Sequence, residues 1–113
     1  MSAQPDTPTP QQPVGTATAI DEFLHTPARL NVCSLLAPAE WVLFSFLRDA
    51  IGTSDSALSK QLTALEQAGY IQIRKERAVR RQTSVRLTAS GRSAFEAYLS
   101  SLEDLLIRAR GRA

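Results

Sequence analysis

The chain has 113 residues, of which 43% are hydrophobic, and its formal net charge is +2. This length suits one small domain, and no run of residues approaches the ~18 apolar residues that span a bilayer. With one cysteine and one histidine, the chain excludes an internal disulfide and offers no zinc-binding spacing. We therefore expect a cytoplasmic protein that binds no metal and no cofactor and has no membrane partner.

The first nineteen residues differ in composition from the rest of the chain. They hold four of the six prolines, no aromatic residue and one charged residue. Without apolar periodicity they can bury nothing, so we predict a disordered tail over residues 1–19. A signal peptide is not expected, because there is neither a basic start nor an apolar run. The folded domain is expected over residues 20–108, with a frayed tail at 109–113.

A first helix is predicted near the start of this domain. It begins near Ile20 or after Thr26, which can cap a helix that has Pro27 at its first position. Pro38 is expected to stop it.

A short strand and a short helix are predicted next. The segment "EWVLF", residues 40–44, is rich in aromatic and branched residues, which favours a strand. Ser45 is expected to cap the helix "FLRDAI", and Gly52 is expected to end it.

The helix predicted over residues 55–68 has an unusual surface. Ser54 is its expected N-cap, Asp55 suits the positive end of the helix dipole, and Gly69 ends the helix. Its apolar face consists of Leu58, Leu62 and Leu65. Its other face carries Ser56, Ser59, Lys60 and Thr63. These are mostly short hydroxyl side chains, where a solvated helix usually carries pairs of Glu and Lys.

Two strands and a long helix complete the predicted elements. The segments "YIQI" (70–73) and "SVRL" (84–87) alternate apolar and polar residues, so we predict a hairpin whose tip is the basic segment between them. Thr88 is expected to cap a final helix that runs to about residue 108, roughly 30 Å at 1.5 Å per residue. Its apolar stripe consists of Ala94, Phe95, Tyr98, Leu99, Leu102, Leu105 and Leu106.

Basic residues are concentrated in the hairpin. Residues 69–92 contain seven basic residues and one acidic residue, whereas the remainder contains six basic and ten acidic residues. A basic block within an otherwise acidic protein indicates a polyanionic partner.

The segment "FLRDAIGTSDSALSKQL" predicts two short helices joined by a tight turn, which is the helix-turn-helix plan. The major groove of DNA admits one α-helix, and short side chains let the helix backbone approach the base edges. The recognition-helix side chains predicted to contact DNA are Ser54, Ser56, Ala57, Ser59, Lys60 and Thr63. The predicted hairpin contacts are Arg74, Lys75, Arg77, Arg80 and Arg81. The first two are expected to touch only the DNA backbone, and the other three to reach phosphates or the minor groove.

From residue 20 to 106 the chain resembles winged-helix DNA-binding domains, most closely the single-domain bacterial regulators near the MarR and ArsR families. The resemblance rests on "PARLNVCSLL", "EWVLFSFLRDAIGTSDSALSKQLTALEQAGYI" and "RKERAVRRQTSVRLTASGR". It implies a mostly α fold with a small β-hairpin wing, in the α+β class. It also implies a sequence-specific transcriptional regulator of double-stranded DNA that acts on a palindromic operator as a repressor or an activator, of which we favour the repressor.

The resemblance further implies a homodimer formed through the first and last helices. The side chains expected at its interface are Phe23, Leu24, Leu99, Leu102, Leu105 and Leu106. A large apolar stripe on a long helix favours a dimer partner over exposure to water.

Two departures from the family argue against a metal. Metal-sensing ArsR proteins carry a Cys-x-Cys pair in the helix before the recognition helix, and "FSFLRDAI" has no cysteine. A second site of that family uses Asp and His on the last helix, where this chain has Glu96, Glu103 and Asp104 but no histidine.

Several alternatives stay open. A winged-helix domain can instead be a protein-interaction module in a larger assembly, although the basic hairpin favours DNA. Cys33 is either a redox sensor or a small buried hydrophobe. Trp41 and Phe44 either line a pocket for an unidentified small-molecule effector or belong to the core. Arg86 and Arg92 are either structural or phosphate-binding. No nucleophile–base pair is recognisable, so we do not expect an enzyme.

Overall fold

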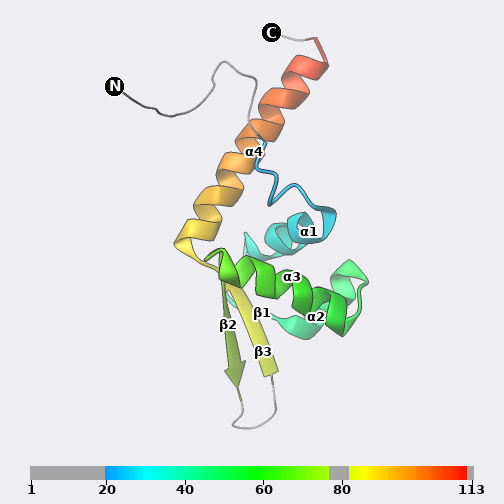
Figure 1. Cartoon of the computed structure of the whole chain (residues 1–113), viewed down its shortest axis with the longest axis vertical. Helices are drawn as coiled ribbons and strands as arrows, with labels where there is room; N and C mark the ends of the chain where they lie inside the picture. The colour runs from blue at the N-terminus through cyan, green and yellow to red at the C-terminus, as the bar shows by residue number, and fades with distance from the viewer. Residues whose placement is uncertain (1–19, 77–81, 112–113) are drawn as a thin grey trace, which may run out of the picture.

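The computed structural model describes residues 20–76 and 82–111. In chain order the elements are α1 (Pro27–Leu36), β1 (Val42–Leu43), α2 (Phe44–Ile51), α3 (Asp55–Gln67), β2 (Ile71–Glu76), β3 (Gln82–Leu87) and α4 (Ala89–Ala109). The fold is mostly helical with a small antiparallel sheet, as expected (Figure 1). The predicted tail 1–19 and the hairpin-tip residues Arg77, Arg80 and Arg81 lie outside the described residues.

Helix α1 begins at Pro27, the second of the two predicted starts. Thr26 occupies the N-cap position, but its side chain makes no capping hydrogen bond. Its hydroxyl instead donates to the Phe23 carbonyl at 3.5 Å. The helix ends at Leu36, two residues before Pro38.

The predicted boundary between β1 and α2 is wrong. Only Val42 and Leu43 pair with β3, opposite Val85 and Ser84, so the strand has two residues rather than five. Leu43 is the N-cap of α2, and Ser45 lies inside the first turn of that helix. The strand propensity of "EWVLF" does not decide its structure, because only two of its residues pair with β3.

The other predicted helix ends are confirmed. Gly52 ends α2 in the left-handed conformation (φ 76°), and Gly69 does the same after α3 (φ 82°). The Ser54 hydroxyl accepts from the Ala57 N–H at 3.1 Å, and the Thr88 hydroxyl accepts from the Gly91 N–H at 2.9 Å. Gly52 and Ser54 fix the tight turn between α2 and α3, so the predicted helix-turn-helix is present.

The sheet has the order β1-β3-β2 and is antiparallel throughout. Pairing between β2 and β3 runs from Ile71 opposite Leu87 to Glu76 opposite Gln82. Both strands therefore extend further toward the tip than predicted, and Arg74 and Lys75 lie within a strand. In Figure 1 this hairpin projects from one end of the molecule, and α4 projects from the other.

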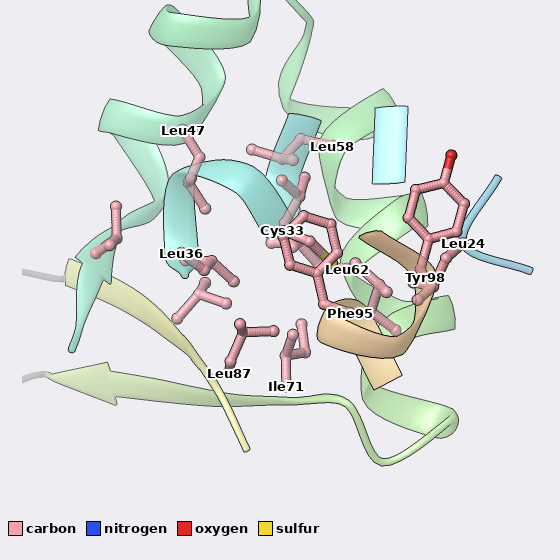
Figure 2. Close-up of a cluster of buried hydrophobic side chains, with 14 residues drawn as sticks. Leu24, Cys33, Leu36, Leu47, Leu58, Leu62, Ile71, Leu87, Phe95 and Tyr98 are labelled. Atoms are coloured by element: carbon pink, nitrogen blue, oxygen red, sulfur yellow. The ribbon is translucent and has the colours of Figure 1, made fainter. Parts of the chain in front are cut away.

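One hydrophobic core lies between the helices and the sheet (Figure 2). The predicted apolar face of α3 is buried in it, with Leu58, Leu62 and Leu65 at most 2% exposed. The other buried hydrophobic residues are Leu24, Val32, Cys33, Leu36, Val42, Leu47, Ile71, Val85, Leu87, Phe95 and Tyr98. The core thus joins every element of the described chain.

The burial of two core residues bears on the roles predicted for them from the sequence. Leu24 is fully buried within its own chain, which leaves it no exposed surface for the predicted dimer contact. Cys33 is 1% exposed, and desolvation by burial raises the pKa of its thiol to about 11. A buried, protonated thiol behaves as a small hydrophobe rather than as a sensor.

The start of α4 is fastened to the end of α3. The Tyr70 carbonyl accepts from the Thr88 N–H at 3.0 Å, and the Gly69 carbonyl accepts from the Thr88 hydroxyl at 2.7 Å. Gly91 packs so closely on Tyr70 that a Cβ there would overlap the Tyr70 carbonyl. Only glycine permits this approach.

Helix α4 continues to Ala109, one residue further than the predicted domain end, and Arg110 is its C-cap. None of the helices in residues 20–76 and 82–111 combines the length and apolarity that crossing a membrane requires.

Candidate nucleic-acid interface

Helix α3 has one buried face and one exposed face. The predicted DNA-contacting residues Ser54, Ser56, Ala57, Ser59, Lys60 and Thr63 are all exposed. Ser54 is also the N-cap, so its hydroxyl already accepts one backbone hydrogen bond. The side chains after it are short except for Lys60, and the helix backbone is therefore open to close approach by a large partner.

A groove of about 640 Å³ separates α3 from the hairpin. We call it the α3–hairpin groove, and it is lined by Phe44, Asp55, Ser59, Leu62, Thr63, Glu66, Ile73, Lys75 and Thr83. It brings two predicted recognition residues, Ser59 and Thr63, together with one predicted hairpin residue, Lys75. Two acidic residues on its wall, Asp55 and Glu66, were not among the predicted contacts.

Arg74 and Lys75 are neighbours in β2, but their side chains lie on opposite faces of the sheet. Successive side chains of a strand point to opposite faces of the sheet. Lys75 lines the groove, whereas the guanidinium of Arg74 lies 4.0 Å from the ring centroid of Trp41 and 3.6 Å from a carboxylate oxygen of Glu76. Of the two predicted backbone contacts, only Lys75 is therefore directed toward α3.

A small residue in the central strand β3 leaves room for the Arg74 side chain to stack on Trp41. Ser84 pairs with Arg74 across the sheet and is 7% exposed. Because β3 lies between β2 and β1, the Arg74 side chain must cross β3 to reach Trp41, which directly precedes β1. Trp41 is thus a platform for an arginine on the outer face of the sheet.

The two arginines whose role was left open are both held by polar groups. Arg86 donates from Nε to Gln72 Oε1 at 2.8 Å, and its guanidinium lies 4.9 Å from the Trp41 ring centroid. Arg92 donates from Nη1 to the carbonyl of Ala37, the C-cap of α1, at 2.7 Å. These contacts fit the structural alternative for both residues.

Arg48, on α2, was missed by the sequence analysis. Its Nε donates to Asp49 Oδ1 at 3.0 Å and its Nη1 donates to Asp55 Oδ1 at 2.9 Å. The hydrogen bond with Asp55, then that with Asp49, raises the pKa of Arg48. The pair with Asp55 links α2 to the first turn of α3. The sequence signal was a basic residue seven positions before an acid that begins a helix.

The predicted dimer contacts other than Leu24 fall into two groups. Phe23 is half-buried, its ring 5.8 Å from that of Tyr70 and 4.3 Å from the Arg29 guanidinium. On α4, Leu99 and Leu106 are 40% and 41% exposed, and Ile107, which was not predicted, is 49% exposed. Leu102 and Leu105 are half-buried.

The single histidine also has a structural partner. His25 Nδ1 lies 2.8 Å from the hydroxyl of Tyr98, whose ring is in the core (Figure 2). Within residues 20–76 and 82–111, no three His, Cys, Asp or Glu side chains gather closely enough to hold a metal ion.

Comparison with known proteins identifies the domain. The winged helix DNA-binding domain model matches residues 28–106. An uncharacterized protein of Methanocaldococcus jannaschii is 26% identical over 85 residues, which are 74% of this chain and 92% of that protein.

Solved structures agree with this match. A transcriptional regulator homologue from Pyrococcus horikoshii OT3 has a TM-score of 0.73 and 27% identity, over 75% of this chain and 85% of that one. YusO from Bacillus subtilis has a TM-score of 0.70 and 25% identity, over 78% and 62% of the two chains. A MarR-family transcriptional regulator from Silicibacter pomeroyi shares the fold, with a TM-score of 0.63 and 18% identity over 78% and 59%. The chain therefore belongs to the winged helix DNA-binding domain family, and a solved structure similar to it is that of a transcriptional regulator homologue.

Proposed function

We propose that this protein is a sequence-specific transcriptional regulator that binds a palindromic operator as a homodimer and acts as a repressor. The observation that carries this proposal is the exposed, hydroxyl-rich face of α3 beside Lys75 in the α3–hairpin groove. The short side chains of Ser56, Ser59 and Thr63 on this face let the helix backbone enter the major groove, where base edges present distinct patterns of donors and acceptors.

The two elements have different tasks in this mechanism. Ser59, Lys60 and Thr63 lie on the exposed face of α3 and would contact base edges. Lys75 would contact a phosphate of the strand that passes between α3 and the hairpin. We also propose that the arginines of the hairpin tip contact phosphates or the minor groove; these are Arg77, Arg80 and Arg81.

The dimer is proposed from the surface of α4. Leu99, Leu106 and Ile107 leave apolar area exposed along a 21-residue helix. A two-fold dimer would place two α3 helices in major grooves about 34 Å apart, one turn of DNA, which is why the operator would be palindromic. A dimer bound over a promoter would exclude RNA polymerase, hence the repressor role.

Selection from a randomised duplex pool, followed by sequencing and by affinity measurements at several salt concentrations, tests this function. We expect an enriched inverted repeat whose affinity falls steeply with salt. Weak binding without an enriched sequence would overturn the proposal and favour the protein-interaction module.

A further inference from the structure

Arg48 lies outside both the recognition helix and the hairpin, yet it borders the surface between them. It lines a hollow of about 230 Å³ with Leu43, Phe44, Ser45, Gln82 and Thr83. Phe44 and Thr83 also line the α3–hairpin groove, so the two depressions adjoin. The Arg48 side chain is 34% exposed there.

Two aspartates orient the guanidinium of Arg48 but do not use all of its N–H donors. Arginine has five N–H donors in a planar fork. Nε and Nη1 are engaged by Asp49 and Asp55, while Nη2 has no hydrogen-bond partner among residues 20–76 and 82–111. Two carboxylates on adjacent nitrogens fix the plane of the group and leave donors directed away from them.

We propose that Arg48 is a DNA phosphate contact, positioned by Asp49 and Asp55. This inference rests on the proposed function. In a helix-turn-helix the first helix crosses the DNA backbone while the start of the second approaches the bases. Arg48 is on the first of these helices and is bonded to the first residue of the second. A planar fork is well suited to a phosphate.

The two acidic partners of Arg48 lie on the surface that is proposed to meet DNA. Asp49 and Asp55 are 73% and 70% exposed, and together they outweigh the charge of Arg48 next to a surface that meets a polyanion. Orienting the arginine gives them a role. A simpler alternative is that the Arg48–Asp55 pair only holds α2 against α3.

Two variants that break the same pair from opposite sides separate these alternatives. Arg48→Gln removes the positive charge, and Asp55→Asn removes its partner but leaves the arginine. If Arg48 contacts a phosphate, Arg48→Gln lowers the slope of log affinity against log salt by about 0.9, Asp55→Asn keeps a slope at least as steep as wild type, and Arg48→Lys restores most of the slope. Arg110→Gln, which makes the same charge change at the far end of α4 (Figure 1), is the matched control.

The slope reports ions released per complex, so a partly unfolded sample does not imitate the effect, and circular dichroism melts check folding. An Arg48→Gln slope equal to wild type, with a lower Tm shared by Asp55→Asn, would show that the pair only joins two helices. A wild-type protein without salt-dependent duplex binding would overturn the proposed function itself, which is a different result.

Discussion

The two ends of the molecule expose different chemistry. At one end, α3 and the hairpin present hydroxyls, Lys75 and the carboxylates of Asp55 and Glu66 around a groove. At the other, α4 presents Leu99, Leu106 and Ile107 to solvent. Polar groups that avoid burial suit a charged partner, whereas exposed leucines suit another apolar surface. The difference supports the proposal that one end binds DNA and the other binds a second copy of the chain.

The largest expected effect is at the joint between the two ends. Gly91→Ala places a methyl group against the Tyr70 carbonyl, so the start of α4 must move away from the end of α3. We expect a loss of about 3 kcal/mol in the free energy of unfolding. Denaturant melts measure it, with the neighbouring exposed residue as control: Ser90→Ala should leave stability within about 0.5 kcal/mol of wild type. A stable Gly91→Ala variant would mean that the two ends are not rigidly joined.

The second prediction concerns the apolar end. Leu106→Glu puts a charge on the exposed stripe of α4 and, if two copies meet there, costs about 3 kcal/mol per dimer. The dimer dissociation constant should rise roughly hundredfold, as measured by sedimentation.

Ser93→Glu adds the same charge at an exposed position near the start of α4 and should leave the dimer intact. A Leu106→Glu protein that sediments like wild type would show that this stripe is not the interface.

The third prediction uses the two faces of the hairpin. Lys75→Ala should weaken binding to every duplex and lower the salt slope by about 0.9, since Lys75 lines the groove. Arg74→Ala should keep the slope and lose about 0.5–1 kcal/mol of stability, because its guanidinium stacks on Trp41. Equal slopes for the two variants would mean that the face of the strand does not decide which residue meets DNA.

The last prediction concerns the core between the two ends. With its pKa raised from 9.0 to about 11, the Cys33 thiol in the native protein should react with iodoacetamide at pH 8 at least ~100-fold more slowly than in the unfolded chain. Because the folded pKa is the higher one, the stability that Cys33 contributes is fully present below pH 9 and is lost as pH rises toward 11. The Cys33→Ala variant should lose that part of the pH dependence. Fast alkylation of the native protein would reopen the redox-sensor alternative.

Features set by a few neighbouring residues could be predicted from the sequence. Ser54, Gly52, Gly69 and Thr88 act within one turn of their helix ends, so their capping roles follow from residue type alone. The exposed face of α3 follows from helical periodicity for the same reason.

Features that depend on distant partners could not be predicted. The length of β1 depends on pairing with β3, and the burial of Leu24 depends on how the segment before α1 packs. Arg74 could have been separated from Lys75 by strand alternation, but only once the strand was known to reach Glu76. The bond from Arg48 to Asp55 needed the angle between α2 and α3.

The most direct test of the DNA-binding end is a comparison of Ser59→Ala with Lys75→Ala on the selected operator and on random duplex. If α3 reads bases, Ser59→Ala lowers operator affinity by roughly 1–3 kcal/mol and leaves random-duplex affinity nearly unchanged, whereas Lys75→Ala lowers both equally. Equal losses on both duplexes for Ser59→Ala would contradict the assignment of α3 as the recognition helix.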